Sequence, residues 1–211
     1  MRRRVPLVAE LHQAAEHPLI KRLYSPSAWS FMLRLWDAHP RWLDLLDSFP
    51  QTFCHLDTFR RNLIARTTKN GADETVVLDW AFAGLAPFGA DLAPLIWVSA
   101  IFREINPHMI LGSEQAIFAS YMQGLTEAGW RGSVQQVRFA YLAMALMNVA
   151  IPTELMQFLN ESAHPALERG FGFPVPEIIS NWAVLLNVAA SYWNEIRALE
   201  STLTSEKSRS R

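Results

Sequence analysis

Two short stretches decide the fold that we expect. Residues 55–62 read His-Leu-Asp-Thr-Phe-Arg-Arg-Asn, and residues 76–80 read Val-Val-Leu-Asp-Trp. Phosphoryl transfer from a nucleotide needs a residue that positions the attacking hydroxyl and oxygen ligands that hold Mg²⁺ against the phosphates. Asp57, Asn62 and Asp79 are suitable residue types for these three roles. Their spacing predicts that Asp57 faces an acceptor while Asn62 turns back toward the metal.

Between the two stretches the sequence predicts a β-hairpin. Residues 62–66 (Asn-Leu-Ile-Ala-Arg) and 75–79 (Thr-Val-Val-Leu-Asp) flank a polar segment containing Asn70-Gly71. This dipeptide supplies the positive φ angles that tight hairpin turns need. The returning strand would bring Asp79 alongside the loop that carries Asp57.

These stretches resemble the aminoglycoside phosphotransferase and choline kinase-like branch of the protein-kinase-like fold. In that family the metal-binding aspartate ends a strand, as in residues 78–80 (Leu-Asp-Trp). A segment with glycine and proline then leads to a second aspartate, as in residues 89–93 (Gly-Ala-Asp-Leu-Ala). Over residues 50–95 the order and spacing of these motifs agree with the pattern of the family.

The resemblance implies ATP as phosphoryl donor and Mg²⁺ as cofactor. Asp57 would be the catalytic base or hydroxyl-orienting residue, and Asn62 and Asp79 would be the magnesium ligands. His55 would be a structural residue of the catalytic loop, and Asp91 would brace that loop from the start of the next helix.

Two features depart from the pattern of this family. Leu56 stands where the branch usually has glycine, and residues 58–61 (Thr-Phe-Arg-Arg) replace the more common loop with histidine and proline. Arg60 and Arg61 are candidate phosphate contacts, with solvated loop charges as the alternative.

The small lobe that such a kinase closes over its nucleotide has no counterpart before His55. Residues 1–54 contain no glycine and one lysine, Lys21, in a helical context. A glycine-rich loop that covers the phosphates, with its paired lysine, is therefore not predicted. We expect the large lobe of the α+β kinase-like fold alone, mainly α with a small β-hairpin.

One domain is expected over residues 1–203. Residues 1–50 would be a lead-in of short helices punctuated by Pro18, Pro26 and Pro40, residues 51–95 would carry the catalytic elements, and residues 96–203 would form a helical bundle on the acceptor side. Helices are predicted near 91–105, 113–128, 134–150, 153–162 and 175–200. Residues 204–211 lack apolar periodicity and are expected to be a flexible tail.

Composition excludes several classes of function. Nineteen basic and 20 acidic residues give a net charge of −1, which offers no general attraction to nucleic acid or to an anionic membrane. The single cysteine, Cys54, excludes an intramolecular disulfide and fits the cytoplasm; we expect it to be buried in a strand. The longest apolar stretch, residues 139–151, is too short to span a bilayer and predicts a buried helix.

The acceptor implied by the resemblance is a small molecule with a hydroxyl, such as an aminoglycoside, an amino alcohol or a sugar-like compound. Trp80, Glu154 and Glu161 are candidate acceptor-binding residues, because carboxylates suit a cationic acceptor. Ordinary exposed helix charges are the alternative for the two glutamates.

A second hypothesis is a catalytically inactive, truncated kinase-like domain that acts as a binding module or is a remnant. Without a small lobe, a free apolar surface predicts either a homodimer or a separate small-lobe partner.

Overall fold

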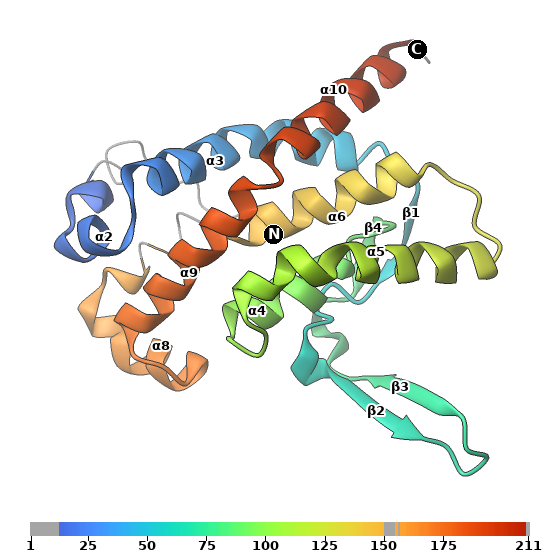
Figure 1. Ribbon diagram of the computed structural model, residues 1–211, viewed down its shortest axis with the longest axis horizontal. Helices are drawn as coiled ribbons and strands as arrows, with labels where there is room; N and C mark the ends of the chain where they lie inside the picture. The colour runs from blue at the N-terminus through green and yellow to red at the C-terminus, as the bar shows by residue number, and fades with distance from the viewer. Residues whose placement is uncertain (1–12, 150–154, 156, 210–211) are drawn as a thin grey trace.

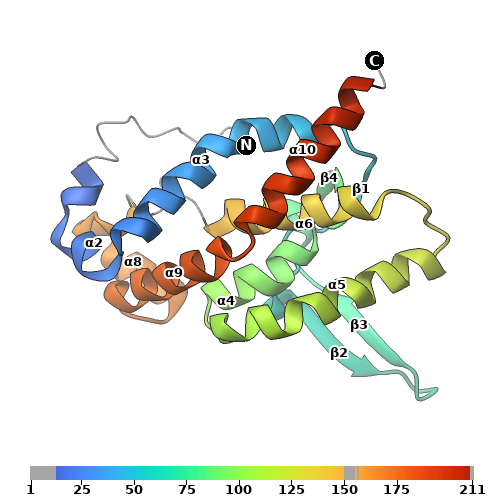
Figure 2. The same ribbon diagram turned by 45° about the horizontal axis from the view of Figure 1, so that its top comes forward.

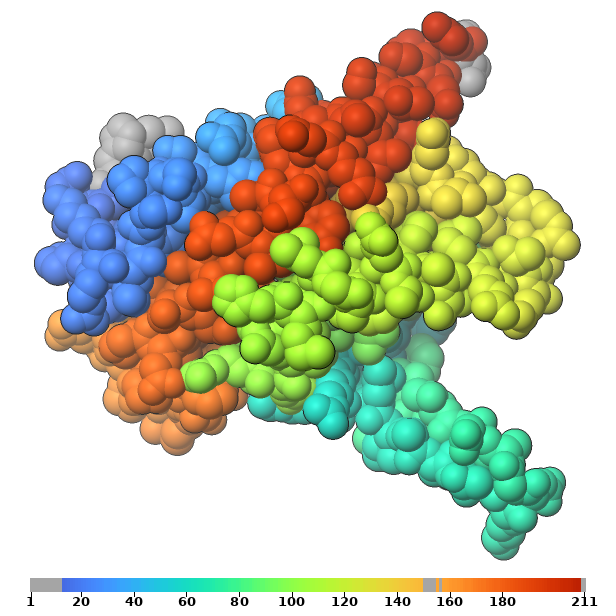
Figure 3. All heavy atoms as spheres, viewed as in Figure 1, coloured from blue at the N-terminus to red at the C-terminus, as the bar shows by residue number. Residues whose placement is uncertain are grey.

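The computed structural model describes residues 13–149, 155 and 157–209 (Figure 1). Most of this part of the chain is helical, and it also contains two small antiparallel sheets. The helices pack into one body, and a hairpin projects from that body as an arm (Figures 1 and 3). The prediction of a mainly α structure with a small β-hairpin is therefore confirmed.

The described part begins with helical residues 13–16, and the two helices that follow each start with a proline after a capping residue. Helix α2 (Pro18–Leu23) is capped by the His17 Nδ1, and helix α3 (Pro26–Leu46) by the Ser25 hydroxyl, which accepts a hydrogen bond from Ala28 N at 3.1 Å. Proline suits this position because its missing N–H would have no helical partner there.

Helix α3 continues through Pro40, where the sequence predicts a break. Proline inside a helix removes one backbone hydrogen bond. The helix persists because its buried face, which includes Leu35, Ala38 and Trp42, packs against α6 and α9. Tertiary packing therefore outweighs the local cost.

The two sheets each pair two strands. Strand β1 (Gln51–Cys54) pairs with β4 (Gly84–Pro87), and β2 (Leu63–Thr67) pairs with β3 (Asp73–Val77), both antiparallel. The second pair is the predicted hairpin, and Gly71 in its turn has φ +78°. The pairing of β1 with β4 was not predicted, because 29 residues separate the two strands and no turn joins them directly.

The remaining helices follow β4. They are the π-helical η3 (Pro94–Val98), α4 (Ser99–Ile101), α5 (Ile110–Glu127), α6 (Val134–Val149), α8 (His164–Phe171), α9 (Val175–Ala190) and α10 (Trp193–Arg209). Short 3₁₀ turns are η1 (Arg60–Asn62), η2 (Trp80–Phe82), η4 (Pro107–Met109) and η5 (Glu161–Ala163).

Several predicted helix boundaries are wrong. The helix expected over 91–105 ends at Ile101 because Arg103 takes a left-handed φ of +58°. The helix expected over 175–200 is two helices that meet at residues 191 and 192. Helix α8 was not predicted. Of the helix expected over 153–162, residues 153, 154 and 156 lie outside the described part, residues 155, 157 and 158 are helical, and residues 161–162 belong to the 3₁₀ turn η5.

The C-terminal segment expected to be a flexible tail is helical as far as Arg209. Lys207 Nζ donates to the carbonyl of Asp44 in α3 at 3.1 Å, and the hydroxyl groups of Ser205 and Ser208 donate to carbonyls one turn earlier. These contacts extend α10 although its last turns bury little apolar surface. Residues 210–211 lie outside the described part.

Helix α6 is the centre of the core. Its buried side chains cover all sides of the helix, and it contacts α3, α9, α10 and η3. A helix that is apolar all round belongs in the interior. The predicted buried helix is therefore confirmed, and α5 lies beside it (Figures 1 and 2).

No single helix in the described residues has both the length and the apolar composition to cross a bilayer. One pair, Glu161–Phe171 with Val175–Ala190, meets that test only when taken together, and it is bent by 72°.

Candidate active site

The candidate site begins where β1 ends and the loop of residues 55–62 starts. His55 is buried, and its Nδ1 accepts a hydrogen bond from the backbone N–H of Asp57 at 3.2 Å. Its Nε2 lies 2.7 Å from the carbonyl oxygen of Leu78. Because Nδ1 accepts, the ring proton is assigned to Nε2, which donates to Leu78. His55 therefore ties the loop to the end of the hairpin, one residue before Asp79.

Asp91 holds the same loop from the other side. Its carboxylate accepts hydrogen bonds from the backbone N–H groups of His55 at 3.1 Å and Leu56 at 2.6 Å. Its carbonyl oxygen accepts a hydrogen bond from the Thr58 hydroxyl. Hydrogen bonds to a carboxylate are stronger than those between neutral groups. Asp91 thus contacts the loop at three points.

Leu56 adopts a left-handed backbone conformation, with φ +63°. This conformation brings Cβ close to the following carbonyl and costs a residue other than glycine about 1–2 kcal/mol. The hydrogen bond from Leu56 N to Asp91 holds it there, and the half-buried side chain packs with Cys54, Ala86 and Ala90. The structure supplies a reason why glycine suits this position.

Asn62 is buried and turns back onto Asp57. Its Nδ2 donates to the Asp57 carbonyl oxygen at 2.8 Å and to Asp57 Oδ2 at 2.9 Å. The 3₁₀ turn η1 makes this return over five residues. Both Nδ2 bonds fix the amide, so that Oδ1 of Asn62 is left as an acceptor for a ligand.

Asp79 lies beside these two residues. Leu78 N donates to the carbonyl of Asn62 at 2.8 Å, which closes the base of the hairpin next to Asp79. Asp79 is exposed and left-handed (φ +54°), and its Oδ1 is 3.4 Å from Ala81 N. Burial raises the pKa of Asp57, the Asn62 hydrogen bond lowers it, and the negative charge of Asp79 raises it further. The structure therefore brings Asp57, Asn62 and Asp79 together.

The donor set fits Mg²⁺ held jointly with a phosphate ligand. No group of three or more His, Cys, Asp or Glu side chains that could hold a metal occurs within residues 13–149, 155 and 157–209. Magnesium commonly binds through one or two carboxylates and completes its shell with phosphate oxygens and water. The Asp79 carboxylate and Asn62 Oδ1 are hard oxygen donors of that kind.

The two arginines of the loop differ in their surroundings. Arg61 forms an ion pair with Glu104, and its guanidinium lies 4.8 Å from the centre of the Phe102 ring. Its charge is therefore engaged by the protein. Arg60 is exposed, and its backbone N–H donates to the Ser99 hydroxyl at 3.0 Å.

Trp80 lies at the site, next to His55. Its ring meets the His55 ring edge-on at 4.8 Å and stacks on Phe53 at 5.9 Å. Its Nε1 donates to the Val77 carbonyl at 3.2 Å, and half of the residue is exposed. Trp80 is thus the one candidate acceptor residue that the described structure places beside the aspartates.

The glutamate candidates stand apart from this cluster. Glu154 lies outside the described residues. Glu161 opens η5, which runs directly into α8, whereas the projecting arm of the hairpin extends away from α8 in Figures 1 and 2. No described contact joins Glu161 to Asp57 or Asp79.

Sequence reasoning missed residues that support the loop from a distance. Phe59 stacks on Phe102 at 5.3 Å, and Phe102 stacks on Phe171 of α8 at 5.1 Å. The aromatic stack connects the loop to α8. A lone phenylalanine between polar loop residues is the only signal in the sequence, and it does not identify its partners.

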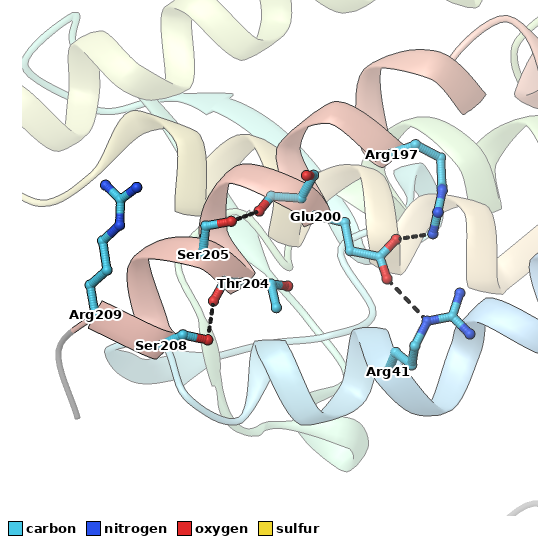
Figure 4. A pocket seen from close by; sticks show the side chains of 8 residues that line it. Arg41, Arg197, Glu200, Thr204, Ser205, Ser208 and Arg209 are labelled. Carbon is cyan, nitrogen blue, oxygen red and sulfur yellow. Dashed lines mark hydrogen bonds and ion pairs between the residues drawn. The ribbon is translucent and has the colours of Figure 1, made fainter.

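A hollow of about 640 Å³ lies between α3 and α10 (Figure 4), and none of its lining residues belongs to the loop or the hairpin. Glu200 accepts hydrogen bonds from Arg41 at 3.2 Å and Arg197 at 2.6 Å, so both guanidiniums are paired with it. The hydroxyl protons of Ser205 and Ser208 are used by backbone carbonyls. Nothing in this hollow adds to the candidate site.

Comparison with known families bears on this loop. A family model described as a phosphotransferase enzyme family matches residues 1–128, a range that includes the loop, Asp79 and Asp91. No curated protein and no solved structure matches the chain significantly.

Proposed function

The chain belongs to the phosphotransferase enzyme family, and on that premise we propose that it transfers the phosphoryl group of ATP to a hydroxyl of a small molecule. The observation that carries the proposal is the grouping of Asp57, Asn62 and Asp79 by the loop and the base of the hairpin. We further propose that the helices form the large lobe of a protein-kinase-like fold, with residues 51–95 as its catalytic part and residues 96–203 on the acceptor side.

Each residue of the group has a separate task in this proposal. Asp57 orients the acceptor hydroxyl, because Asn62 holds its Oδ2 and leaves Oδ1 to accept the hydroxyl proton. Asn62 Oδ1 and the Asp79 carboxylate would hold Mg²⁺, which when bound supplies positive charge against the phosphates. Asp91 and His55 keep the loop in place.

The proposed acceptor is a hydroxyl compound such as an aminoglycoside, an amino alcohol or a sugar-like molecule. The support is the family and the half-exposed Trp80 ring beside the loop, which offers a flat apolar surface to a sugar or a cation. A panel of these compounds, assayed for ATP consumption dependent on acceptor, identifies the class.

A second candidate function is a non-catalytic binding module. It is favoured by the exposed aromatic and aliphatic side chains on the β1–β4 sheet next to the site. Such side chains are what a protein-binding surface presents.

The first prediction tests the metal and nucleotide site. Titration calorimetry of the chain with ATP and Mg²⁺ is expected to show binding that Asp79→Asn weakens at least tenfold, because one of two proposed ligands loses its charge. Asp57→Asn is expected to bind normally and to abolish transfer.

Asp73→Asn is the matched control, since Asp73 is an exposed hairpin aspartate that accepts a hydrogen bond from the Thr67 hydroxyl at the end of the ladder far from Asp79. If wild type, Asp73→Asn and Asp79→Asn bind ATP and Mg²⁺ equally well, Asp79 is not a ligand of the metal. No binding by a folded wild-type chain would favour the binding-module function.

A further inference from the structure

An apolar surface without cover lies on the β1–β4 sheet. Phe53 on β1 and Leu85 on β4 are register partners, so their side chains point to the same face of the sheet. Phe53 is 65% exposed and Leu85 is 75% exposed. Trp80, 52% exposed, stacks on the Phe53 ring with an angle of 11° between the planes. Phe82, 65% exposed, ends the same 3₁₀ turn.

Register joins Phe53 with Leu85, and ring stacking joins Phe53 with Trp80, while Phe82 belongs to the same 3₁₀ turn as Trp80 and comes two residues before β4. We call these four residues the apolar face. Scattered exposed apolar residues are normal on protein surfaces, whereas contiguous patches of several hundred Å² commonly mark interaction sites. An aromatic side chain offers about 200 Å². With the exposed fractions above, the four residues present on the order of 500 Å² to solvent.

The size of this face matches what self-association requires. Two copies that cover all four residues completely would bury at most about 1,000 Å² in total, which is the lower limit for a specific but weak protein interface. A net charge of −1 on the chain opposes such an encounter only weakly. The four residues carry no charge, so the same surface can face itself across a twofold axis.

Both sheets have strand edges without a partner strand. Among the described residues each sheet has only two strands, so each has unpaired outer edges. Two-stranded sheets are marginally stable in water unless another layer or strand supports them. The hairpin β2–β3 also stands out from the body (Figure 3).

We propose that the apolar face is the contact surface of a symmetric dimer, in which a second copy of this chain covers Phe53, Trp80, Phe82 and Leu85. This proposal rests on exposure and register. It uses the Trp80 ring that the proposed function offers to an acceptor, so a dimer would compete with the acceptor for that ring. An interface of this size lies at the weak end of specific complexes, so the expected dissociation constant is in the micromolar range.

Sedimentation velocity of the chain across a concentration series, without nucleotide or Mg²⁺, tests the proposal. We expect a dimer at roughly 100 µM that dissociates on dilution. The double variant Phe53→Lys with Leu85→Lys is expected to raise the dissociation constant at least tenfold, because each copy then brings two charges into an apolar contact. The single variant Leu85→Lys, at a more exposed position, repeats the test if the double variant does not fold.

The matched control is the double variant Met109→Lys with Leu111→Lys. Both residues are exposed and apolar, and they lie on η4 and α5, outside the apolar face. This variant should dimerise like the wild type. A wild-type chain that stays monomeric, or lysine variants of both surfaces with equal association, would overturn the proposal.

A second measurement locates the contact. Cys54 is the only cysteine, it is buried, and burial raises the pKa of its thiol to about 12, so that it reacts poorly with thiol reagents. Leu85→Cys should therefore allow a short bifunctional thiol reagent to join two chains, whereas Met109→Cys should not. Cross-linking of both variants to the same extent would contradict the proposed face.

Discussion

At the scale of the residue, Leu56 shows how the site stores strain. Its left-handed φ is held by Asp91, and its side chain is half-buried. Truncation to alanine removes the packing and keeps the strain, and truncation to glycine removes both. Leu56→Gly is therefore expected to be about 1 kcal/mol more stable than Leu56→Ala in urea unfolding.

Leu85 is the comparison for this pair, because it lies in β4 and has no positive φ. There the order should reverse, with Leu85→Gly less stable than Leu85→Ala by about 0.5–1 kcal/mol. The same order at both positions would mean that Leu56 is not strained.

Cys54 makes the stability of the fold depend on pH. Burial raises the pKa of its thiol from 9.0 to about 12, and the nearby Asp91 charge acts in the same direction. Between these values the unfolded chain loses the proton while the folded chain keeps it, so stability falls as pH rises above about 9.

Thermal unfolding of wild type and Cys54→Ala measures this effect. The wild type should lose more stability than the variant between pH 8.5 and 10, because buried tyrosines contribute equally to both chains. Parallel curves would show that the thiol ionises normally.

At the scale of the element, one arginine joins three helices. Arg138 of α6 is mostly buried and pairs with Glu114 of α5, and its Nε donates to Glu195 of α10 at 2.6 Å. Its guanidinium also lies 4.9 Å from the centre of the Phe118 ring. Charges in the interior are tolerated only while they are paired.

Removing one member of this buried pair should be costly. Arg138→Met is expected to lower the free energy of unfolding by about 3–5 kcal/mol, because Glu114 is left as an unpaired buried carboxylate. The double variant with Glu114→Leu should recover more than half of the loss. Urea unfolding measures both.

Arg66 and Glu74 form the comparison pair, with 2.8 Å between their charged atoms on the exposed hairpin. Arg66→Met should cost no more than about 1 kcal/mol. Similar losses at both arginines would show that burial of the Arg138 pair does not matter.

At the scale of the whole molecule, residue patterns predicted features that depend on residues close together in the chain. They did not predict most features that depend on residues far apart in the chain. The hairpin follows from apolar runs around a polar turn, and the buried α6 from an apolar stretch without a polar face. The grouping of Asp57 and Asn62 follows from five residues of loop. These features depend on neighbours in the chain.

Other features depend on contacts that no single sequence displays. Helix α3 passes Pro40 because α6 and α9 cover its face, and α10 reaches Arg209 because Lys207 meets Asp44. The β1–β4 pairing joins segments 29 residues apart, and it decides that Phe53 and Leu85 face solvent together. Long-range pairing therefore determines the apolar face, whereas within the site only the contact of Asp57 with Asn62 follows from short-range spacing.

The register of the hairpin β2–β3 also sets a length. Asn62 directly precedes β2 and Asp79 comes two residues after β3, with Leu63 opposite Val77 as the pair nearest the body. A shift of the pairing by one residue would reverse which face every β3 side chain occupies and would move Asp79 along the strand direction by about 3.3 Å. The backbone hydrogen bonds between β2 and β3 therefore set the spacing between Asn62 and Asp79. A variant that loosens the turn of the hairpin is expected to change this spacing, although the turn lies far from both residues.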